Sequence, residues 1–216
     1  MFFLVFEGLD GSGKSSLMKM LDQYLKDPSH GRVFSTALTR EPGGTEIGDR
    51  LRDLILDKSF KTPPQARTEL LMYQASRAQH VDCVIRPALA EKKWVLCDRF
   101  SASSIAFQGG GRGISIEQVE WLNHFSTDNL EPDLTILLDL SVEESRQRRN
   151  RRSDATGSIE DRIESEADDF HQRVREGFLA QARKAPQKWL VLDAAQSPEK
   201  LFEILVSQLR DRKWLD

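Results

Sequence analysis

The amino-acid sequence predicts an α/β fold, a three-layer sandwich built on a five-stranded parallel sheet. Short, nearly all-apolar runs recur along the chain, and segments with the period of an amphipathic helix lie between them. Strands that are apolar on both faces are typical of a parallel sheet covered by helices on each side. In such sheets, ligands bind beyond the carboxyl ends of the strands.

The expected strands are the apolar runs Phe2–Phe6, Val33–Leu38, Trp94–Cys97, Leu134–Leu138 and Trp189–Leu192. Helical periodicity marks the segments Ser15–Leu25, Ile47–Leu56, Ala66–Ala90, Ile116–Phe125, Val142–Arg149, Ile159–Arg183 and Pro198–Arg210. Two stretches interrupt this pattern and are expected to be loops, the glycine-rich Gln108–Gly113 and the arginine-rich Arg148–Ser158. We interpret the second, the lid segment (148–158), as a mobile flap, with an ordinary solvated surface loop as the alternative.

Length and composition favour one soluble globular domain that spans residues 1–216. Apolar residues make up 39% of the chain and charged residues 30%, as in ordinary globular proteins. The net charge of −3 gives no overall attraction to nucleic acid or to an anionic membrane. We therefore expect neither as a partner, and any phosphate must be bound by a local basic cluster.

Neither the cysteines nor the amino terminus indicate an exported protein. Cys83 and Cys97 lie in apolar surroundings and are expected to be small buried side chains in a reducing compartment. The apolar run Phe2–Phe6 is too short for a signal peptide, and no basic residue precedes it. No apolar stretch approaches the ~18 residues of a membrane-spanning helix, so the cytoplasm is the expected location.

Residues 8–15 carry a specific phosphate-binding motif. They are GLDGSGKS, and they match the pattern G-x-x-x-x-G-K-[ST] between an expected strand and an expected helix. The glycines let backbone N–H groups converge on phosphate oxygens, and the helix amino terminus adds a positive dipole. Lys14 is expected to reach the β- and γ-phosphates, and Ser15 to offer its hydroxyl to Mg²⁺. The predicted triphosphate-binding residues are Gly8, Gly11, Ser12, Gly13, Lys14, Ser15 and Ser16.

Asp10 is an unusual residue for such a loop. A carboxylate beside a polyphosphate is electrostatically unfavourable, so its side chain is expected to point away from the triphosphate. It could accept a hydrogen bond from a sugar hydroxyl of a second substrate. Asp also suits tight turns, and a purely structural role in the loop is an equally open alternative.

A second group of charged residues is expected at the same end of the sheet. Asp98 ends a buried strand, where a carboxylate is costly unless it serves a metal ion or a base, and Mg²⁺ is the expected metal. Arg99 could clamp an anionic oxygen. A salt bridge with Asp98 is disfavoured because adjacent strand residues point to opposite faces. In and after the turn TREPGGT (39–45), Arg40, Glu41 and Arg52 could line a phosphate pocket or be surface charges.

Together these motifs resemble the bacterial-type thymidylate kinases, which are P-loop nucleoside-monophosphate kinases. The resemblance runs from the first expected strand to the last helix. It rests on GLDGSGKS, TREPGGT, LMYQASRAQH (71–80), CDRFSASSIAFQGGGRG (97–113) and DRIESE (161–166), in the family's order and approximate spacing. It implies the P-loop nucleoside-monophosphate kinase fold. It also implies a homodimeric enzyme that phosphorylates dTMP to dTDP with ATP and Mg²⁺, in dTTP synthesis for DNA replication.

The resemblance assigns the acceptor side to dTMP. Asp10 matches the acidic residue that contacts the 3′-hydroxyl, and Tyr73 matches an aromatic residue, usually Phe, that stacks on thymine. Arg77 and Gln108 match residues that hydrogen-bond the base edge. Tyr73 and Arg77 stand at i and i+4 of one expected helix, so one base could touch both. The other residues implied around dTMP are Glu41, Arg52, Arg99, Ser103 and Ser104.

The resemblance also implies that the lid segment carries the catalytic arginine. The family holds this residue either in the phosphate loop or in the lid, and the loop here contains none. The lid segment has Arg148, Arg149, Arg151 and Arg152, and which of them acts is left open. The catalytic residues implied are Lys14, Arg99, Arg149, Arg151 and Arg152. The implied dimer interface uses the helices around Ala66–Ala90 and Ile116–Phe125.

Two alternatives stay open at this level. Another nucleotide or deoxynucleoside kinase could use the same scaffold, although Tyr73, Arg77 and Gln108 argue for thymine. A nucleotide-dependent switch or regulatory ATPase would share the phosphate loop, but it needs no second nucleotide pocket.

Overall fold

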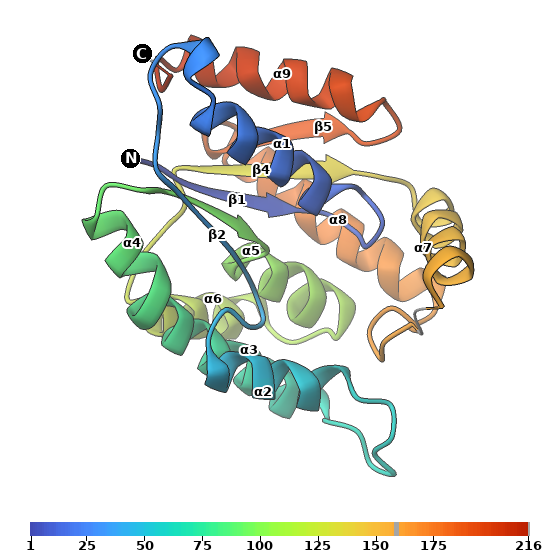
Figure 1. The fold of residues 1–216 in the computed structure, drawn as a ribbon. Coiled ribbons are helices and arrows are strands. Elements are labelled where there is room, and N and C mark those ends of the chain that lie inside the picture. Colours follow the sequence, from blue (N-terminus) through green and yellow to red (C-terminus); the bar gives the residue numbers. More distant parts are fainter. Residues whose placement is uncertain (158–159, 216) are drawn as a thin grey trace.

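The computed structural model describes residues 1–157 and 160–215 and is built around one parallel sheet (Figure 1). Its strands are β1 (Phe3–Glu7), β2 (Thr36–Arg40), β3 (Trp94–Asp98), β4 (Leu134–Asp139) and β5 (Trp189–Asp193). They lie in the order β2-β3-β1-β4-β5, and every neighbouring pair is parallel. The predicted five-stranded parallel sheet of an α/β fold is confirmed, with strand bounds shifted by a few residues.

Helices cover both faces of the sheet because alternate strand residues point to opposite sides. Leu4 and Phe6 belong to the core formed with α1 (Lys14–Lys26) and α9 (Pro198–Asp211). Phe3 and Val5 pack on the other side, and Figure 1 shows the sheet between the two groups of helices. The helices of the second group are the π-helical η2 (Val81–Ile85), α4 (Arg86–Ala90), α5 (Ser101–Ser104), the π-helical η3 (Ile105–Gly111) and α8 (Asp168–Lys184). The helix α3 (Ala66–His80) continues directly into η2.

The remaining elements lie at the edges of this sandwich. Two helices pack on α3, namely α2 (Glu46–Leu56) and α6 (Ile116–Thr127). A further helix, α7 (Val142–Thr156), lies where the strand arrows end in Figure 1. Single 3₁₀ turns, η1 (Pro28–His30) and η4 (Pro186–Lys188), precede β2 and β5. The carboxyl ends of the strands are therefore the side that α7 covers.

The expectation of a loop over the lid segment is wrong for residues 148–156, because α7 continues to Thr156. No glycine or proline interrupts the arginine-rich run before Gly157, which takes a φ of 68° and ends the helix. The end of the lid segment at Ser158, and Ile159 at the start of the next expected helix, lie outside the described residues. That helix, α8, begins only at Asp168, and acidic residues in its first turn suit a helix amino terminus.

The glycine-rich stretch Gln108–Gly113 is also more helical than expected, since η3 runs to Gly111. The glycines there allow close packing against α8. A Cβ on Gly111 would lie 2.5 Å from Cε2 of Phe170, and one on Gly110 would lie 3.0 Å from the carbonyl oxygen of Arg173. Glycine is needed at both positions so that α8 can lie close to η3. The glycines therefore serve packing and do not turn this stretch into a loop.

Both cysteines are free thiols, and only one is buried. Cys97 lies in the core under β3 as expected. The expectation for Cys83 is wrong, because it faces outward from η2, where Gln79 Nε2 lies 3.0 Å from its Sγ. Within residues 1–157 and 160–215, no helix has the length and apolar character to cross a membrane.

Candidate active site

The phosphate-binding loop connects β1 to α1 at the carboxyl end of the sheet. Gly8 has a φ of 134°, and a Cβ there would clash with the carbonyl oxygen of Leu138 in β4. Gly13, at a φ of 96°, starts α1 without any side-chain cap. Lys14 folds back over the loop, and its Nζ donates to the carbonyl oxygens of Gly8 (3.2 Å) and Leu9 (3.1 Å). Burial, and then the nearby Arg99, lower the pKa of the Lys14 ammonium.

The start of α1 has the properties of an anion site. The N–H groups of the first helical turn, from Lys14 to Ser16, have no intrahelical acceptor, and no acidic side chain lies in that turn. The hydroxyl of Ser12 is buried, and no described residue is its hydrogen-bond partner. Buried hydroxyls normally have a partner, so this one suits a phosphate oxygen. The predicted triphosphate residues therefore come together at one loop and one helix end.

Oxygen ligands suitable for Mg²⁺ lie beside this loop. Ser15 Oγ donates a 2.7 Å hydrogen bond to Asp98 Oδ2 at the end of β3. Mg²⁺ typically uses only one or two carboxylates, with waters and substrate phosphates completing its shell. The described parts of the chain contain no group of three or more potential His, Cys, Asp and Glu ligands. A Ser–Asp pair next to a triphosphate site nevertheless fits Mg²⁺, because the triphosphate supplies further oxygens.

Arg99 pairs with the loop residue Asp10 and not with the neighbouring Asp98. Its Nη2 donates to Asp10 Oδ1 at 2.7 Å, and its Nη1 lies 3.6 Å from Glu7 Oε2. Burial alone would raise the pKa of the Asp10 carboxyl, but the charges of Arg99 and Lys14 outweigh burial and lower it. Asp10 is therefore an ionised hydrogen-bond acceptor at neutral pH.

Glu7 was not singled out from the sequence, yet it organises this corner of the site. It is fully buried, and its Oε1 accepts the N–H groups of Phe100 (3.0 Å) and Ser103 (3.2 Å). Its Oε2 accepts the hydroxyl of Ser103 at 2.7 Å. Burial raises the pKa of Glu7, and the charge of Arg99 opposes this effect. The available signal was a carboxylate that ends an apolar strand, the same signal that marks Asp98.

A pocket of about 540 Å³, including its open mouth, lies next to Arg99 and Asp10. Every residue that the resemblance places around dTMP lines this one pocket, and so do Leu56, Phe100, Phe107, Asp161 and Ile163. Arg40, the other candidate from the turn, does not line it; its side chain is exposed and pairs with Asp49. The predicted residues that it brings together are Asp10, Glu41, Arg52, Tyr73, Arg77, Arg99, Ser103, Ser104 and Gln108.

Arg77 is held more tightly than the sequence suggests. It is 2% exposed, and its Nε donates to Glu41 Oε2 at 2.8 Å. Its Nη2 donates to the carbonyl oxygen of Phe100 at 3.1 Å, so one Nη2 hydrogen is left for a ligand. The Nη1 atom is used within the protein, by Gln74, Ser104 and Asn123. Glu41 is equally committed, because His80 Nδ1 lies 3.0 Å from its Oε1.

The α7 arginines lie on a helix that packs on the phosphate loop. A Cβ on Gly11 would lie 3.1 Å from Cβ of Arg148. Arg149 is 3% exposed, and its Nη1 donates to Ser145 Oγ at 2.9 Å. Ser145 in turn donates to the carbonyl oxygen of Asp10 at 2.7 Å. Arg148 therefore contacts the loop directly, whereas Arg149, one of the predicted catalytic arginines, is connected to it through the side chain of Ser145.

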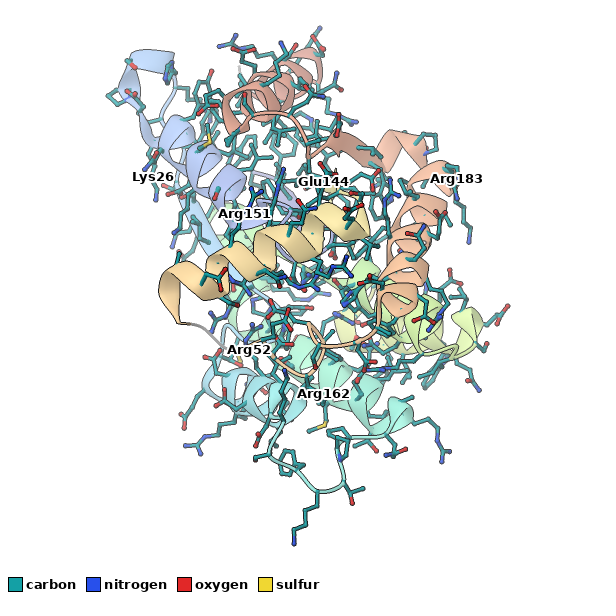
Figure 2. All side chains as sticks on the ribbon, turned by 90° about the vertical axis from the view of Figure 1, so that its right-hand side faces the viewer. Lys26, Arg52, Glu144, Arg151, Arg162 and Arg183 are labelled. Carbon is teal, nitrogen blue, oxygen red and sulfur yellow. The ribbon has the colours of Figure 1, made fainter. Side chains whose placement is uncertain are left out.

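The other two arginines of the lid segment, Arg151 and Arg152, are more exposed. Arg152 pairs with Glu164 Oε1 at 2.6 Å, whereas Arg151 has no protein partner among the described residues. Figure 2, which looks onto the carboxyl ends of the strands, shows Arg151 on the side of α7 that faces α1. Arg52 and Arg162 lie on the opposite side of α7 in that view. The helix thus has arginines toward both the phosphate loop and solvent.

Comparison with known proteins places the chain in a family. The sequence model described as thymidylate kinase matches residues 6–204. A thymidylate kinase of Bdellovibrio bacteriovorus is 58% identical, covering 100% of this chain and 98% of the relative. One of Desulfovibrio desulfuricans is 47% identical, covering 91% and 89%. The crystal structure of a thymidylate kinase from Ehrlichia chaffeensis is similar with a TM-score of 0.73 and 32% identity, covering 96% of this chain and 98% of that one. The chain therefore belongs to the thymidylate kinase family.

Proposed function

We propose that this chain transfers the γ-phosphoryl group of ATP to dTMP, making dTDP for dTTP synthesis. The observation that carries the proposal is that one residue, Asp10, belongs both to the phosphate-binding loop and to the wall of the second pocket. A donor and an acceptor nucleotide would then meet beside it. A regulatory switch would have no use for the second pocket, which favours a kinase.

The transfer needs no strong general base, because the acceptor oxygen belongs to a phosphate that is already anionic. Catalysis would come from positioning and from neutralising charge on the transferred group. Lys14 would bind the donor phosphates, and Arg99 the acceptor phosphate. The α7 arginines would stabilise charge that develops on the equatorial oxygens. Mg²⁺, held by Ser15 and Asp98, would add positive charge at the donor phosphates when bound.

On the acceptor side, each chemical part of dTMP has a suitable partner. Asp10 is ionised and can accept the hydrogen of the 3′-hydroxyl. Tyr73 presents a ring that can stack on the base. Gln108 and the remaining Nη2 hydrogen of Arg77 can meet the base edge. Arg52, Ser103 and Ser104 complete the proposed lining.

We also propose that the protein forms a homodimer in the cytoplasm, with α3 and α6 at the interface. Four large apolar side chains on these helices are exposed, Leu71 by 55%, Ile116 by 39%, Trp121 by 65% and Phe125 by 75%. The rings of Trp121 and Phe125 stack with their centroids 6.0 Å apart. An apolar surface of this kind is typical of an interface. No contact with nucleic acid or a membrane is proposed.

Base choice tests the proposed function. We expect activity in the order dTMP, dUMP, dCMP, with purine monophosphates excluded by size. Uracil lacks only the methyl group, which is worth about 1–3 kcal/mol, whereas cytosine would leave polar groups of the pocket unpaired. A coupled ADP-release assay across the nucleoside monophosphates measures this order. If dCMP or a purine nucleotide is the better acceptor, the thymidylate assignment is wrong and only a generic kinase remains.

Lys14→Ala should leave a folded protein whose activity is lower by about 10²-fold or more, because a charge partner of the phosphates is lost. Lys19→Ala is the matched control, since Lys19 is exposed on the same helix. It should keep wild-type turnover. Thermal melts followed by circular dichroism check that both variants fold. Near-normal turnover of folded Lys14→Ala would exclude the proposed role.

Single alanine substitutions of Arg148, Arg149, Arg151 and Arg152 test the α7 arginines. For at least one of them, kcat should fall more than dTMP affinity, because an arginine that acts mainly in the transition state is lost from kcat. Arg146→Ala is the control, since this exposed α7 residue pairs with Asp168. If all four substitutions leave kcat unchanged, the catalytic charge lies elsewhere.

Trp121→Glu should convert the dimer into a monomer, because a charge would replace an aromatic anchor at the interface. Val33→Glu is the control, because Val33 is an exposed apolar residue outside α3 and α6. This variant should remain a dimer. Sedimentation velocity at micromolar concentration measures both. A monomeric wild-type protein, or a dimeric Trp121→Glu variant, would count against this interface.

A further inference from the structure

Glu69 on α3 is the centre of a buried charge cluster next to the pocket. Its side chain is fully buried, and its Oε1 accepts hydrogen bonds from Gln108 Nε2 at 3.0 Å and from Arg112 Nε at 3.2 Å. Its Oε2 accepts from Arg112 Nη2 at 3.1 Å and from Arg162 Nη2 at 2.6 Å. Two segments that are distant in sequence, η3 with the residue that follows it and the turns before α8, therefore converge on one carboxylate. Only Gln108 among its partners lines the pocket.

The two arginines keep this carboxylate charged. Burial alone would raise the pKa of the Glu69 carboxyl. The hydrogen bonds and charge of Arg112, with further hydrogen bonds from Gln108 and Arg162, outweigh burial and hold the pKa below its ordinary value. Glu69 is therefore ionised at neutral pH, and an ionised carboxylate can accept hydrogen bonds but cannot donate them.

This acceptor-only neighbour decides which end of the Gln108 amide faces the pocket. The amide has one donor end and one acceptor end, and the hydrogen-bond network determines its orientation. Its –NH₂ group must face Glu69, because the opposite orientation would place two acceptors against each other. Among the described residues, no donor is bonded to Gln108 Oε1. The carbonyl oxygen is thus the end that a ligand in the pocket can meet.

From this arrangement we infer that Glu69 sets the choice of base by holding Gln108 as a hydrogen-bond acceptor toward the pyrimidine. The inference rests on the proposed function, in which Gln108 meets the base edge. Thymine and uracil carry a hydrogen on N3, which Oε1 can accept. Cytosine N3 carries a lone pair instead of a hydrogen. Cytosine N3 and Oε1 of Gln108 would then be two acceptors facing each other, and neither would have a donor. If the Gln108 amide could rotate by half a turn, its –NH₂ group could donate to cytosine N3. The site would then discriminate poorly between thymine and cytosine.

Arg77 supplies the matching donor. A guanidinium has only N–H groups, and the Nη2 hydrogen that is left suits a carbonyl oxygen of the base. A donor from Arg77 and an acceptor from Gln108 match the O4 and N3–H of thymine in that order, whereas cytosine offers N4–H and N3 in the reverse order. Glu69, Tyr73 and Arg77 follow one another at intervals of four residues on α3, so the three lie along one helix face.

A purely structural role for Glu69 makes a different prediction. If the carboxylate only neutralises Arg112 and Arg162, its replacement would lower stability and would reduce activity with every acceptor alike. A positioning residue for Gln108 changes the ratio between acceptors. The readout is therefore the ratio of kcat/KM for dTMP to kcat/KM for dCMP.

Glu69→Gln tests the inference in the full-length enzyme. Gln at 69 can present either end of its amide, so Gln108 is no longer fixed. We expect the dTMP/dCMP ratio to fall by about tenfold or more, with KM for ATP unchanged. Glu166→Gln is the matched control: Glu166 Oε1 pairs with Arg112 Nη1 at 2.6 Å and lies outside the contacts of Gln108. Like Glu69→Gln, the Glu166→Gln substitution removes one negative charge beside Arg112. It should keep the wild-type dTMP/dCMP ratio.

Gln108→Met keeps the pairs of Glu69 with both arginines and serves if Glu69→Gln fails to fold. It removes the amide, so the ratio should fall by a similar factor. An unchanged ratio in folded Glu69→Gln, or in Gln108→Met, overturns the inference, and so does an equal fall in Glu166→Gln. A wild-type enzyme that prefers dCMP refutes the proposed function instead, so the two failures are distinguishable.

Discussion

Arg99 lies between Asp10 of the phosphate loop and Glu7 of β1, and the rest of the site is arranged around these contacts. Its φ of 71° is uncommon for a residue with a side chain, and it turns the chain as β3 ends. Glu7 holds the next turn through the N–H groups of Phe100 and Ser103. Removing one partner of a buried ion pair typically costs about 3–5 kcal/mol. The cluster thus joins the phosphate loop, the end of β1 and the turn after β3 at one edge of the pocket.

Asp10 connects this cluster to α7. Its carboxylate pairs with Arg99, and its carbonyl oxygen accepts the hydroxyl of Ser145, which also accepts a hydrogen bond from Arg149. The position of α7 is therefore coupled to the loop through one serine. Because α7 is helical as far as Thr156, its arginines move as one body, and a change in the tilt of α7 would move all of them relative to the phosphate loop. A flexible loop would carry no such constraint.

Local patterns in the sequence were sufficient for the strands and the phosphate loop, since apolar runs and glycine spacing depend only on neighbours in the chain. The acceptor pocket was different, because Tyr73 and Gln108 stand on separate helices and only the family resemblance joined them. Glu7 and Glu69 were missed because their roles depend on partners far away in sequence. The helix over residues 148–156 was missed because a dense run of arginines suggested a solvated loop, although nothing before Gly157 breaks a helix.

The central claim is that an acceptor pocket is already assembled beside the phosphate loop, with Arg99 as its anion clamp. Calorimetric titration of dTMP into the protein without ATP tests it most directly. The account predicts saturable binding by the wild-type protein. It also predicts much weaker binding by Arg99→Met, with ADP affinity nearly unchanged, because a charged hydrogen-bond partner of the acceptor phosphate is lost. No binding of dTMP until ATP is present, or equal dTMP affinity of the wild type and Arg99→Met, would contradict it.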